Sequence, residues 1–299
     1  MKILLTGATG YLGSHLAKRF VEDGHEVSVL LRSVSNTGRI SGLLGHLRCY
    51  QIEAGGLEAL FREIRNLDVV VHTATSYGRN GETPLAVAEA NTWFPLRILD
   101  LAYANGVDMF VNTDSFFAGE VTYDYLANYA LSKQHFAEWG RRYAEARRLR
   151  FLNVRLEHIF GPGDDESKFI NWVVRRCIES SEPIELTEGA QKRDFIFIDD
   201  VVSAFSLLLN NARSLNAGWT ALGLGSGHAV TVRHIVELVH RLSASKTQLV
   251  FGANPYRRGE IMYSCADNSL LTKMGWSPAS DLETAVRKLI TFGSGHPAT

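Results

Sequence analysis

Residues 2–13 read KILLTGATGYLG, and this stretch decides the fold. Its apolar start is typical of a buried parallel strand, and apolar residues at helical spacing follow over 11–23. Gly7, Gly10 and Gly13 stand between the two. Glycine here allows a tight turn, a close approach of phosphate to the backbone, and close packing of helix on strand. Because a helix N-terminus also attracts phosphate, the stretch predicts a dinucleotide site rather than an ordinary glycine-rich loop.

Strand and helix patterns alternate through the first half of the chain. Strands are expected over 26–31, 47–52, 68–72, 109–113 and 151–156, and helices over 57–65, 84–103 and 128–148. This order predicts an α/β fold, a Rossmann-type doubly wound parallel sheet with helices on both faces. Ligands of such sheets bind beyond the carboxyl ends of the strands.

After Gly161-Pro162-Gly163 the regular alternation stops. The later pattern predicts helices over 168–179, 199–209, 232–242 and 282–291, and strands over 184–186, 195–197, 219–224 and 247–251. We expect an NAD(P)-binding Rossmann domain over 1–160 and a smaller C-terminal α/β substrate-binding lobe over 161–299. Elements near 199–224 are expected to return to the first domain.

Composition excludes several classes of protein. The chain has 299 residues, 45% of them hydrophobic, and a formal net charge of −1. This balance argues against nucleic acid or a membrane surface as a partner. No apolar run approaches the roughly 20 residues of a membrane span. Cys49, Cys177 and Cys265 lack metal-ligand spacing, so we expect reduced thiols, no metal site and a cytoplasmic location.

The end of the second predicted strand bears on the choice of dinucleotide. NAD-binding folds usually place a carboxylate there to hold the ribose 2′-hydroxyl. Here the strand is followed by Arg32, Ser33 and Ser35, with no carboxylate before Glu53. Because an arginine attracts a 2′-phosphate, we expect NADP, with NAD as the alternative if Arg32 is only a solvated loop residue.

The chemical centre is predicted by Tyr129-x-x-x-Lys133 at the start of a long helix. Residues four apart share a helix face, and an ammonium beside a phenol lowers the phenol pKa, which favours proton transfer. Ser115, just after the fifth strand, is expected to hydrogen-bond the substrate oxygen. Taken alone, this spacing is usually just a helix surface. Because a dinucleotide-binding motif precedes it in this chain, the catalytic interpretation of Tyr129 and Lys133 is favoured.

Together these motifs resemble the extended short-chain dehydrogenase/reductase family of nucleotide-sugar epimerases, dehydratases and ketoreductases, over nearly the whole chain. Arg193-Asp194-Phe195 with Asp199-Asp200-Val201 is similar to the family's RDF…DD segment. The resemblance implies that Arg193 and Arg257 bind a diphosphate. With the motifs above, the expected cofactor-binding residues are Gly7, Thr9, Gly10, Tyr11, Leu12, Arg32, Ser33, Ala74, Asn91, Thr113, Tyr129 and Lys133.

Within the family, four stretches resemble the CDP-paratose synthase-like CDP-3,6-dideoxyhexose 4-ketoreductases. They are TATSYGRN (73–80), LEHIFG (156–161), QKRDFIFI (191–198) and IMYSCAD (261–267). Many relatives carry Arg-x-x-Asn-x-Tyr-Gly after the sixth strand, whereas this chain has His158 at the asparagine position. Glu157 and His158 are therefore expected to touch substrate or cofactor, with plain packing as the alternative.

The resulting expectation is NADPH-dependent reduction of a 4-keto group on a nucleotide-activated deoxysugar. The expected catalytic residues are Ser115, Tyr129 and Lys133, and the expected substrate-binding residues are Thr75, Tyr77, Ser115, Glu157, His158, Arg193 and Arg257. The alternatives are an NAD-dependent nucleotide-sugar 4-epimerase and a non-catalytic dinucleotide-sensing protein, although such sensors usually lack Tyr-x-x-x-Lys. The resemblance also implies a homodimer through the helices at 84–103 and 128–148.

Overall fold

The computed structural model describes residues 1–52, 56–117, 126–147, 149–215 and 217–293. Residues 118–125, in the short segment between Ser115 and Tyr129, lie outside this description. The chain forms two compact units. Of the described residues, unit 1 comprises those within 1–117, 126–155 and 202–222, and unit 2 comprises those within 156–201 and 223–293.

Unit 1 is built on a seven-stranded sheet with the order β10-β6-β5-β4-β1-β2-β3. The strands are β1 (Lys2–Thr6), β2 (Glu26–Leu31), β3 (Leu47–Gln51), β4 (Val69–His72), β5 (Met109–Ser115), β6 (Arg150–Leu156) and β10 (Gly218–Leu224). The pairs from β3 through β2, β1 and β4 to β5 are parallel. The strand order reverses between β1 and β4, the place where doubly wound sheets bind ligands. The predicted Rossmann fold is confirmed.

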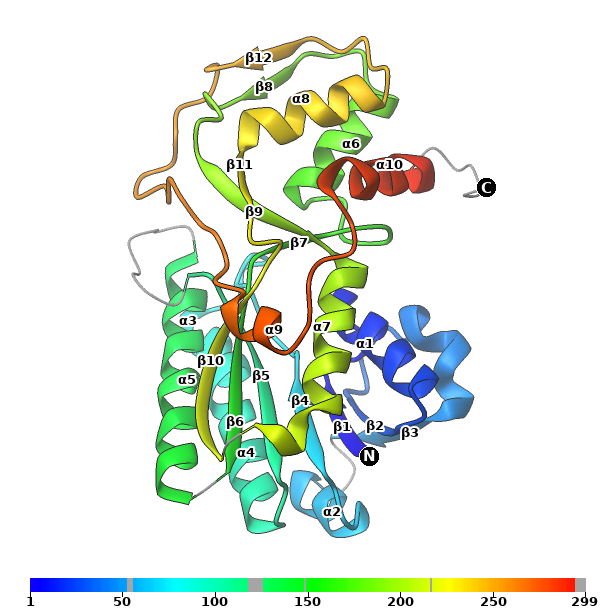
Figure 1. The fold of residues 1–299 in the computed structure, drawn as a ribbon, viewed down its shortest axis with the longest axis vertical. Helices are drawn as coiled ribbons and strands as arrows, with labels where there is room; N and C mark the ends of the chain where they lie inside the picture. Colours follow the sequence, from blue (N-terminus) through cyan, green and yellow to red (C-terminus); the bar gives the residue numbers. More distant parts are fainter. Residues whose placement is uncertain (53–55, 118–125, 148, 216, 294–299) are drawn as a thin grey trace. The chain divides into compact units, whose positions relative to one another are not determined.

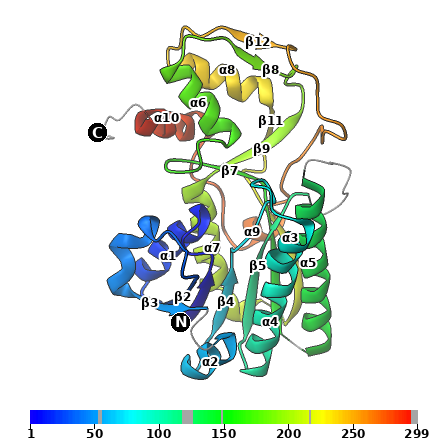
Figure 2. The same ribbon diagram turned by 180° about the vertical axis from the view of Figure 1, so that it is seen from behind.

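Helices cover both faces of this sheet (Figures 1 and 2). They are α1 (Tyr11–Glu22), α2 (Gly56–Glu63), α3 (Pro84–Ala88), α4 (Phe94–Ala104), α5 (Ala127–Arg147) and α7 (Ile198–Asn210), with 3₁₀ turns at Gly38–His46 and Ala212–Ser214. On the face under α4 and α5, Phe110 and Phe151 stack with ring centroids 5.3 Å apart, and Phe136 packs edge-on against both. These rings belong to an apolar core cluster of unit 1.

The long helix predicted over 84–103 is interrupted. A π-helical turn at Glu89–Trp93 separates α3 from α4 and carries the buried Asn91. Such turns re-aim side chains and are frequent at functional sites.

Unit 2 contains two small sheets. One has the order β11-β9-β7 and the other pairs β12 with β8. The strands are β7 (His158–Phe160), β8 (Ile184–Leu186), β9 (Lys192–Phe197), β11 (Ala229–Thr231) and β12 (Leu249–Phe251), and the helices are α6 (Phe169–Glu179), α8 (Val232–Leu242), α9 (Ser269–Lys273) and α10 (Leu282–Gly293). The sequence pattern did not predict β7, β11 or α9, which are three to five residues long.

A buried carboxylate organises the centre of unit 2. Asp194, fully buried on β9, accepts hydrogen bonds from the backbone N–H groups of Ser226, Gly227 and Ala266 and from the Ser226 hydroxyl. A buried anion is tolerated when donors satisfy its oxygens. Asp194 therefore fastens two loops to β9.

Within the described residues, no helix is long and apolar enough to cross a membrane. The same residues contain no cluster of three or more His, Cys, Asp or Glu side chains that could hold a metal ion.

Candidate active site

The glycine-rich loop lies against the end of β4. Gly7 has a φ of +74°, and a Cβ there would stand 2.5 Å from the Ala74 nitrogen. A Cβ at Gly13 would stand 2.1 Å from the Gly7 carbonyl oxygen, so α1 packs as closely as the spacing predicts. Gly10 caps α1 without any side-chain hydrogen bond. The first turn of α1 therefore offers backbone donors to an anion, which fits a dinucleotide pyrophosphate.

Asn91, on the π-helical turn, fastens the loop that follows β4. Its amide oxygen accepts from the Ser76 N–H at 2.8 Å and from the Thr75 hydroxyl at 3.2 Å. Its amide nitrogen donates to the Ser76 carbonyl at 2.8 Å and to the Ser132 hydroxyl at 3.0 Å. Both donors and both acceptor positions of the amide are thus engaged within the protein. This geometry favours a positioning role for Asn91 over direct cofactor contact.

Tyr129 and Lys133 lie on the first turns of α5, and both are buried. The Lys133 Nζ donates to the Thr113 carbonyl on β5 at 2.9 Å, two residues before Ser115. The Tyr77 ring packs on Tyr129, with centroids 4.9 Å apart. The structure therefore brings together the predicted Ser115, Tyr129 and Lys133, with Tyr77 beside them.

Burial dominates the electrostatics of this trio. Burial is the largest cause that raises the pKa of Tyr129 well above its ordinary value, and Tyr77 and Asp114 also raise it. A hydrogen bond with Ser115 and the charge of Arg79 lower this pKa, but they do not offset the burial. The expectation that Lys133 lowers this pKa is not met, because the loss of hydration outweighs the nearby charges. Burial also lowers the pKa of Lys133 from 10.5 to about 8, although the charge of Asp114 opposes this.

A row of buried polar side chains crosses the sheet beneath α5. The Asn112 amide donates to Asn153 at 2.7 Å, and the Asn153 amide donates to the Asp114 carboxylate at 2.6 Å. On the neighbouring strands, His72 Nδ1 and the Thr6 hydroxyl lie 2.7 Å apart. Sequence reasoning missed this row. Its signal was the alternation of polar residues at 112 and 114, which places both on one sheet face.

At the carboxyl end of β2, Arg32 and Ser33 are exposed, and the Arg32 N–H donates to the Ser35 hydroxyl at 3.0 Å. A second cation lies beside the start of α1, where the Arg39 guanidinium stands 5.7 Å from the centroid of the Tyr11 ring. Tyr11 belongs to the first turn of α1, so Arg39 is a cofactor-binding candidate that sequence reasoning missed.

In unit 2, Arg193 is buried and its Nη2 donates to Glu260 at 2.6 Å. Glu260 follows the exposed Arg257 by three residues, and its N–H donates to the Arg257 carbonyl at 3.1 Å. The two predicted diphosphate ligands are thus linked through Glu260, another residue that sequence reasoning missed.

His158 is the first residue of β7 in unit 2, and Glu157 directly precedes it. The Ser264 hydroxyl lies 2.6 and 2.7 Å from the two oxygens of the buried Glu157 carboxylate. His158 Nδ1 lies 3.5 Å from the same carboxylate. These contacts engage Glu157 in holding the segment around Ser264.

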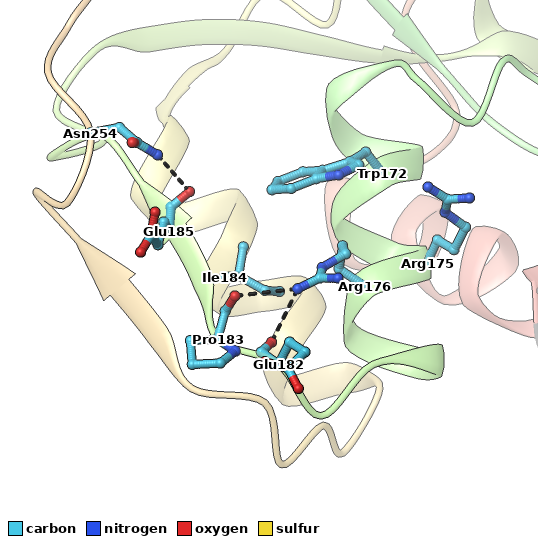
Figure 3. Close-up of a pocket in the computed structure, with 8 residues that line it drawn as sticks. All are labelled: Trp172, Arg175, Arg176, Glu182, Pro183, Ile184, Glu185 and Asn254. Atoms are coloured by element: carbon cyan, nitrogen blue, oxygen red, sulfur yellow. Dashed lines mark hydrogen bonds between the residues drawn. The ribbon is translucent and has the colours of Figure 1, made fainter.

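Unit 2 also has an open groove of about 550 Å³ between α6 and β8 (Figure 3). The Trp172 ring stands on one side of it, and Asn254 donates to the Glu185 carbonyl at 3.0 Å on the other. Arg176 reaches across to the carbonyls of Glu182 and Pro183, at 3.3 Å each. The groove thus combines an aromatic face with charged and amide groups.

Comparison with known proteins agrees with this geometry. The sequence model of the NAD dependent epimerase/dehydratase family matches residues 3–220. CDP-abequose synthase of Salmonella muenchen is 36% identical over 294 residues, which cover 97% of this chain and 97% of that enzyme. A putative UDP-glucose 4-epimerase of Methanocaldococcus jannaschii is 22% identical over 307 residues, covering 97% of each chain.

Two solved structures show the same fold. UDP-glucose 4-epimerase of Thermotoga maritima, determined with UDP-glucose, has a TM-score of 0.82 at 22% identity and covers 99% of both chains. UDP-glucuronic acid 4-epimerase of Bacillus cereus, determined with UDP-glucuronic acid and NAD, has a TM-score of 0.83 at 20% identity, again over 99% of both. With the family match over residues 3–220, these findings establish that the chain belongs to the NAD dependent epimerase/dehydratase family.

Proposed function

We propose that this NAD(P)-dependent nucleotide-sugar enzyme reduces the 4-keto group of a CDP-activated deoxyhexose. The observation that carries the proposal is the 36% identity with CDP-abequose synthase over 97% of both chains. The site geometry supports it, because Ser115, Tyr129 and Lys133 meet at the carboxyl end of β5.

In this mechanism the nicotinamide dinucleotide, when bound, supplies the hydride. Tyr129 donates its phenolic proton to the oxygen at C4, and Ser115 holds that oxygen by a hydrogen bond. The raised pKa keeps Tyr129 protonated at neutral pH, which is the form a proton donor needs. Lys133 holds a positive charge behind the phenol and binds the ribose. Asn91 keeps the loop with Thr75 and Tyr77 in place beside the sugar.

The glycine loop fits a dinucleotide, since its close contacts leave no room for side chains at Gly7 and Gly13. We assign NADP because Arg32, Ser33 and Arg39 offer donors for a 2′-phosphate and the strand end carries no carboxylate. Replacing Arg32 with Ala should weaken NADPH binding about tenfold or more and leave NADH binding nearly unchanged. Equal losses for both cofactors in fluorescence titrations would contradict the NADP assignment.

Unit 2 is assigned the nucleotide part of the substrate. Arg193 and Arg257 supply positive charge for the diphosphate, and Glu260 orients the Arg193 guanidinium. Glu157 acts through Ser264 and is assigned a positioning role rather than a substrate contact.

A homodimer is also proposed. Trp93 is 56% exposed on the π-helical turn, and Trp139 is 45% exposed on α5, with Leu131 exposed on the same helix. Large exposed apolar side chains gathered on packed helices are typical of an interface. Trp139→Glu should convert a dimer to a monomer in sedimentation analysis, whereas Phe292→Glu on α10 should not. A monomeric wild-type protein would exclude the dimer.

The activity is tested by mixing purified protein with NADPH and a CDP-4-keto-3,6-dideoxyhexose and following the absorbance of NADPH. The proposal expects stoichiometric NADPH consumption, at a rate that falls about 100-fold or more in Tyr129→Phe. No consumption with this or any other 4-keto nucleotide sugar would reject it. Interconversion of two nucleotide sugars without added cofactor, with NAD carried through purification, would instead identify a 4-epimerase.

A further inference from the structure

Asp114 stands between two functional residues of β5, Thr113 and Ser115, and is 3% exposed. One carboxylate oxygen accepts the Ser115 backbone N–H at 2.8 Å, and the other accepts the Asn153 amide at 2.6 Å. The carboxylate therefore fixes the backbone that carries the Ser115 hydroxyl. A carboxylate this deeply buried lowers stability unless positive charge compensates it.

The compensating charge is on α5. Lys133 is also 3% exposed, and its one hydrogen bond among the described residues goes to the neutral Thr113 carbonyl. No described carboxylate comes within 4.0 Å of the ammonium, so there is no direct ion pair. Asp114 and Lys133 nevertheless interact through the low-dielectric interior: the charge of Lys133 lowers the pKa of Asp114, and the charge of Asp114 raises the pKa of Lys133.

The other groups that face this pair are accounted for. On β4, His72 is fully buried, and burial together with the Lys133 charge lowers its pKa well below its ordinary value, so it is neutral. On β6, Arg155 faces Asp114. On α5 itself, Tyr129 is protonated at neutral pH. Among these groups, Asp114 is the anion available to Lys133.

We propose that Asp114 is a positioning residue of the active site, whose buried carboxylate orients Ser115 and serves as the counter-charge of the Lys133 ammonium. The proposal goes beyond the assigned reaction and does not depend on which sugar is reduced. It explains why a polar row crosses the sheet: the Asn153 amide donates to the carboxylate, and the Asn112 amide donates to the Asn153 amide oxygen and so orients it.

Asp114→Asn removes the charge and keeps the shape. Flipping the Asn153 and Asn112 amides would preserve the row, since the Asn112 amide oxygen has no partner among the described residues. A merely structural role therefore predicts little change in this variant. The counter-charge role predicts that Lys133 loses its proton at lower pH, by about one unit or more.

The test measures unfolding free energies from pH 6 to 10 for four proteins: wild type, Lys133→Met, Asp114→Asn and the double variant. Subtracting each Met variant from its parent isolates the titration of Lys133. The proposal expects this titration to begin about one pH unit lower in the Asp114→Asn background. The basic limb of the pH profile of kcat/KM should move in the same direction. The same onset in both backgrounds would overturn the proposal.

Two further variants keep the test decisive. Asn153→Ala removes a hydrogen bond to Asp114 and keeps the charge, so it should lower stability without moving the onset. Asp114→Ser, which needs less space, must show the same displacement as Asp114→Asn. Failure of both Asp114 variants to fold would assign the carboxylate to sheet stability alone and overturn the proposal. The unfolding measurements need neither cofactor nor sugar, so failure of the ketoreductase proposal would be seen separately.

Discussion

Lys133→Met should cost the protein its activity while leaving its stability equal or higher at neutral pH. Burial lowers the pKa of Lys133 from 10.5 to about 8. At about 1.4 kcal/mol per pKa unit, the ammonium destabilises the folded state by about 3 kcal/mol at pH 7, where lysine is charged both folded and unfolded. Methionine removes this cost but leaves the buried Thr113 carbonyl without its donor, which costs about 1–3 kcal/mol. The net expectation at pH 7 lies between no change and a gain of about 2 kcal/mol.

The sign of the pH dependence follows from the same numbers. Between pH 8 and 10.5 the unfolded lysine holds its proton and the folded one does not, so the unfolded state binds more protons. The Lys133 contribution therefore makes the wild-type protein more stable with rising pH, by about 1.4 kcal/mol per unit above pH 8. The methionine variant lacks this contribution, so any advantage it has at pH 7 must shrink and then reverse.

Urea unfolding of both proteins at pH 7, 8, 9 and 10 measures this difference. Lys18→Met is the matched control, because Lys18 is 66% exposed on α1 and its replacement should give a small difference that does not vary over this range. If the wild-type and Lys133→Met curves differ by the same amount at pH 7 and pH 10, the buried ammonium does not have a lowered pKa and the reasoning fails.

Three other outcomes are expected. Gly13→Ala places a Cβ against the Gly7 carbonyl, so it should lower the free energy of unfolding by about 1–3 kcal/mol and abolish NADPH binding. Denaturant unfolding and fluorescence titration measure the two effects, and unchanged NADPH binding would contradict the close packing of α1. Tyr129→Phe should slow the reaction about 100-fold or more while cofactor affinity stays within about threefold, which stopped-flow and titration would separate. Asp194→Ala leaves three backbone N–H donors without their acceptor, so it should lower the free energy of unfolding by about 3 kcal/mol or more. A lower melting temperature would show this loss.

The parts of the fold that local pattern controls were predictable. Apolar runs and helical spacing predicted the strands β1 to β6 and the helices α1, α2 and α5, because each segment buries one face or both on the sheet. The single helix expected over 84–103 is instead interrupted by the π-helical turn at Glu89–Trp93. Strands β7 and β11 were missed although the equally short β8 was predicted, because their strand conformation depends on pairing with β9 and not on a local pattern. They exist because β9 lies between them and supplies both sets of hydrogen bonds.

The candidate site likewise contains residues that local sequence spacing brings together and residues that only the tertiary fold brings together. Tyr129 and Lys133 lie four residues apart on one helix, so local spacing sufficed to bring them together. Asp114, by contrast, contacts the Asn153 amide only because β6 lies beside β5 in the folded sheet. Glu260 reaches Arg193 across 67 residues of chain. Such pairs depend on topology, and a single sequence does not contain them in readable form.

The burial of Tyr129 and Lys133 affects both the stability of the protein and the protonation states from which its reaction starts. Loss of hydration raises the pKa of Tyr129 and lowers that of Lys133, so both groups are pushed toward their neutral forms. At pH 7 the phenol then holds its proton, and Lys133, with a pKa of about 8, still holds most of its charge. A reductase needs this combination, because the phenol must begin as a donor. An enzyme that first oxidises a sugar hydroxyl needs phenolate, so the same burial would work against it.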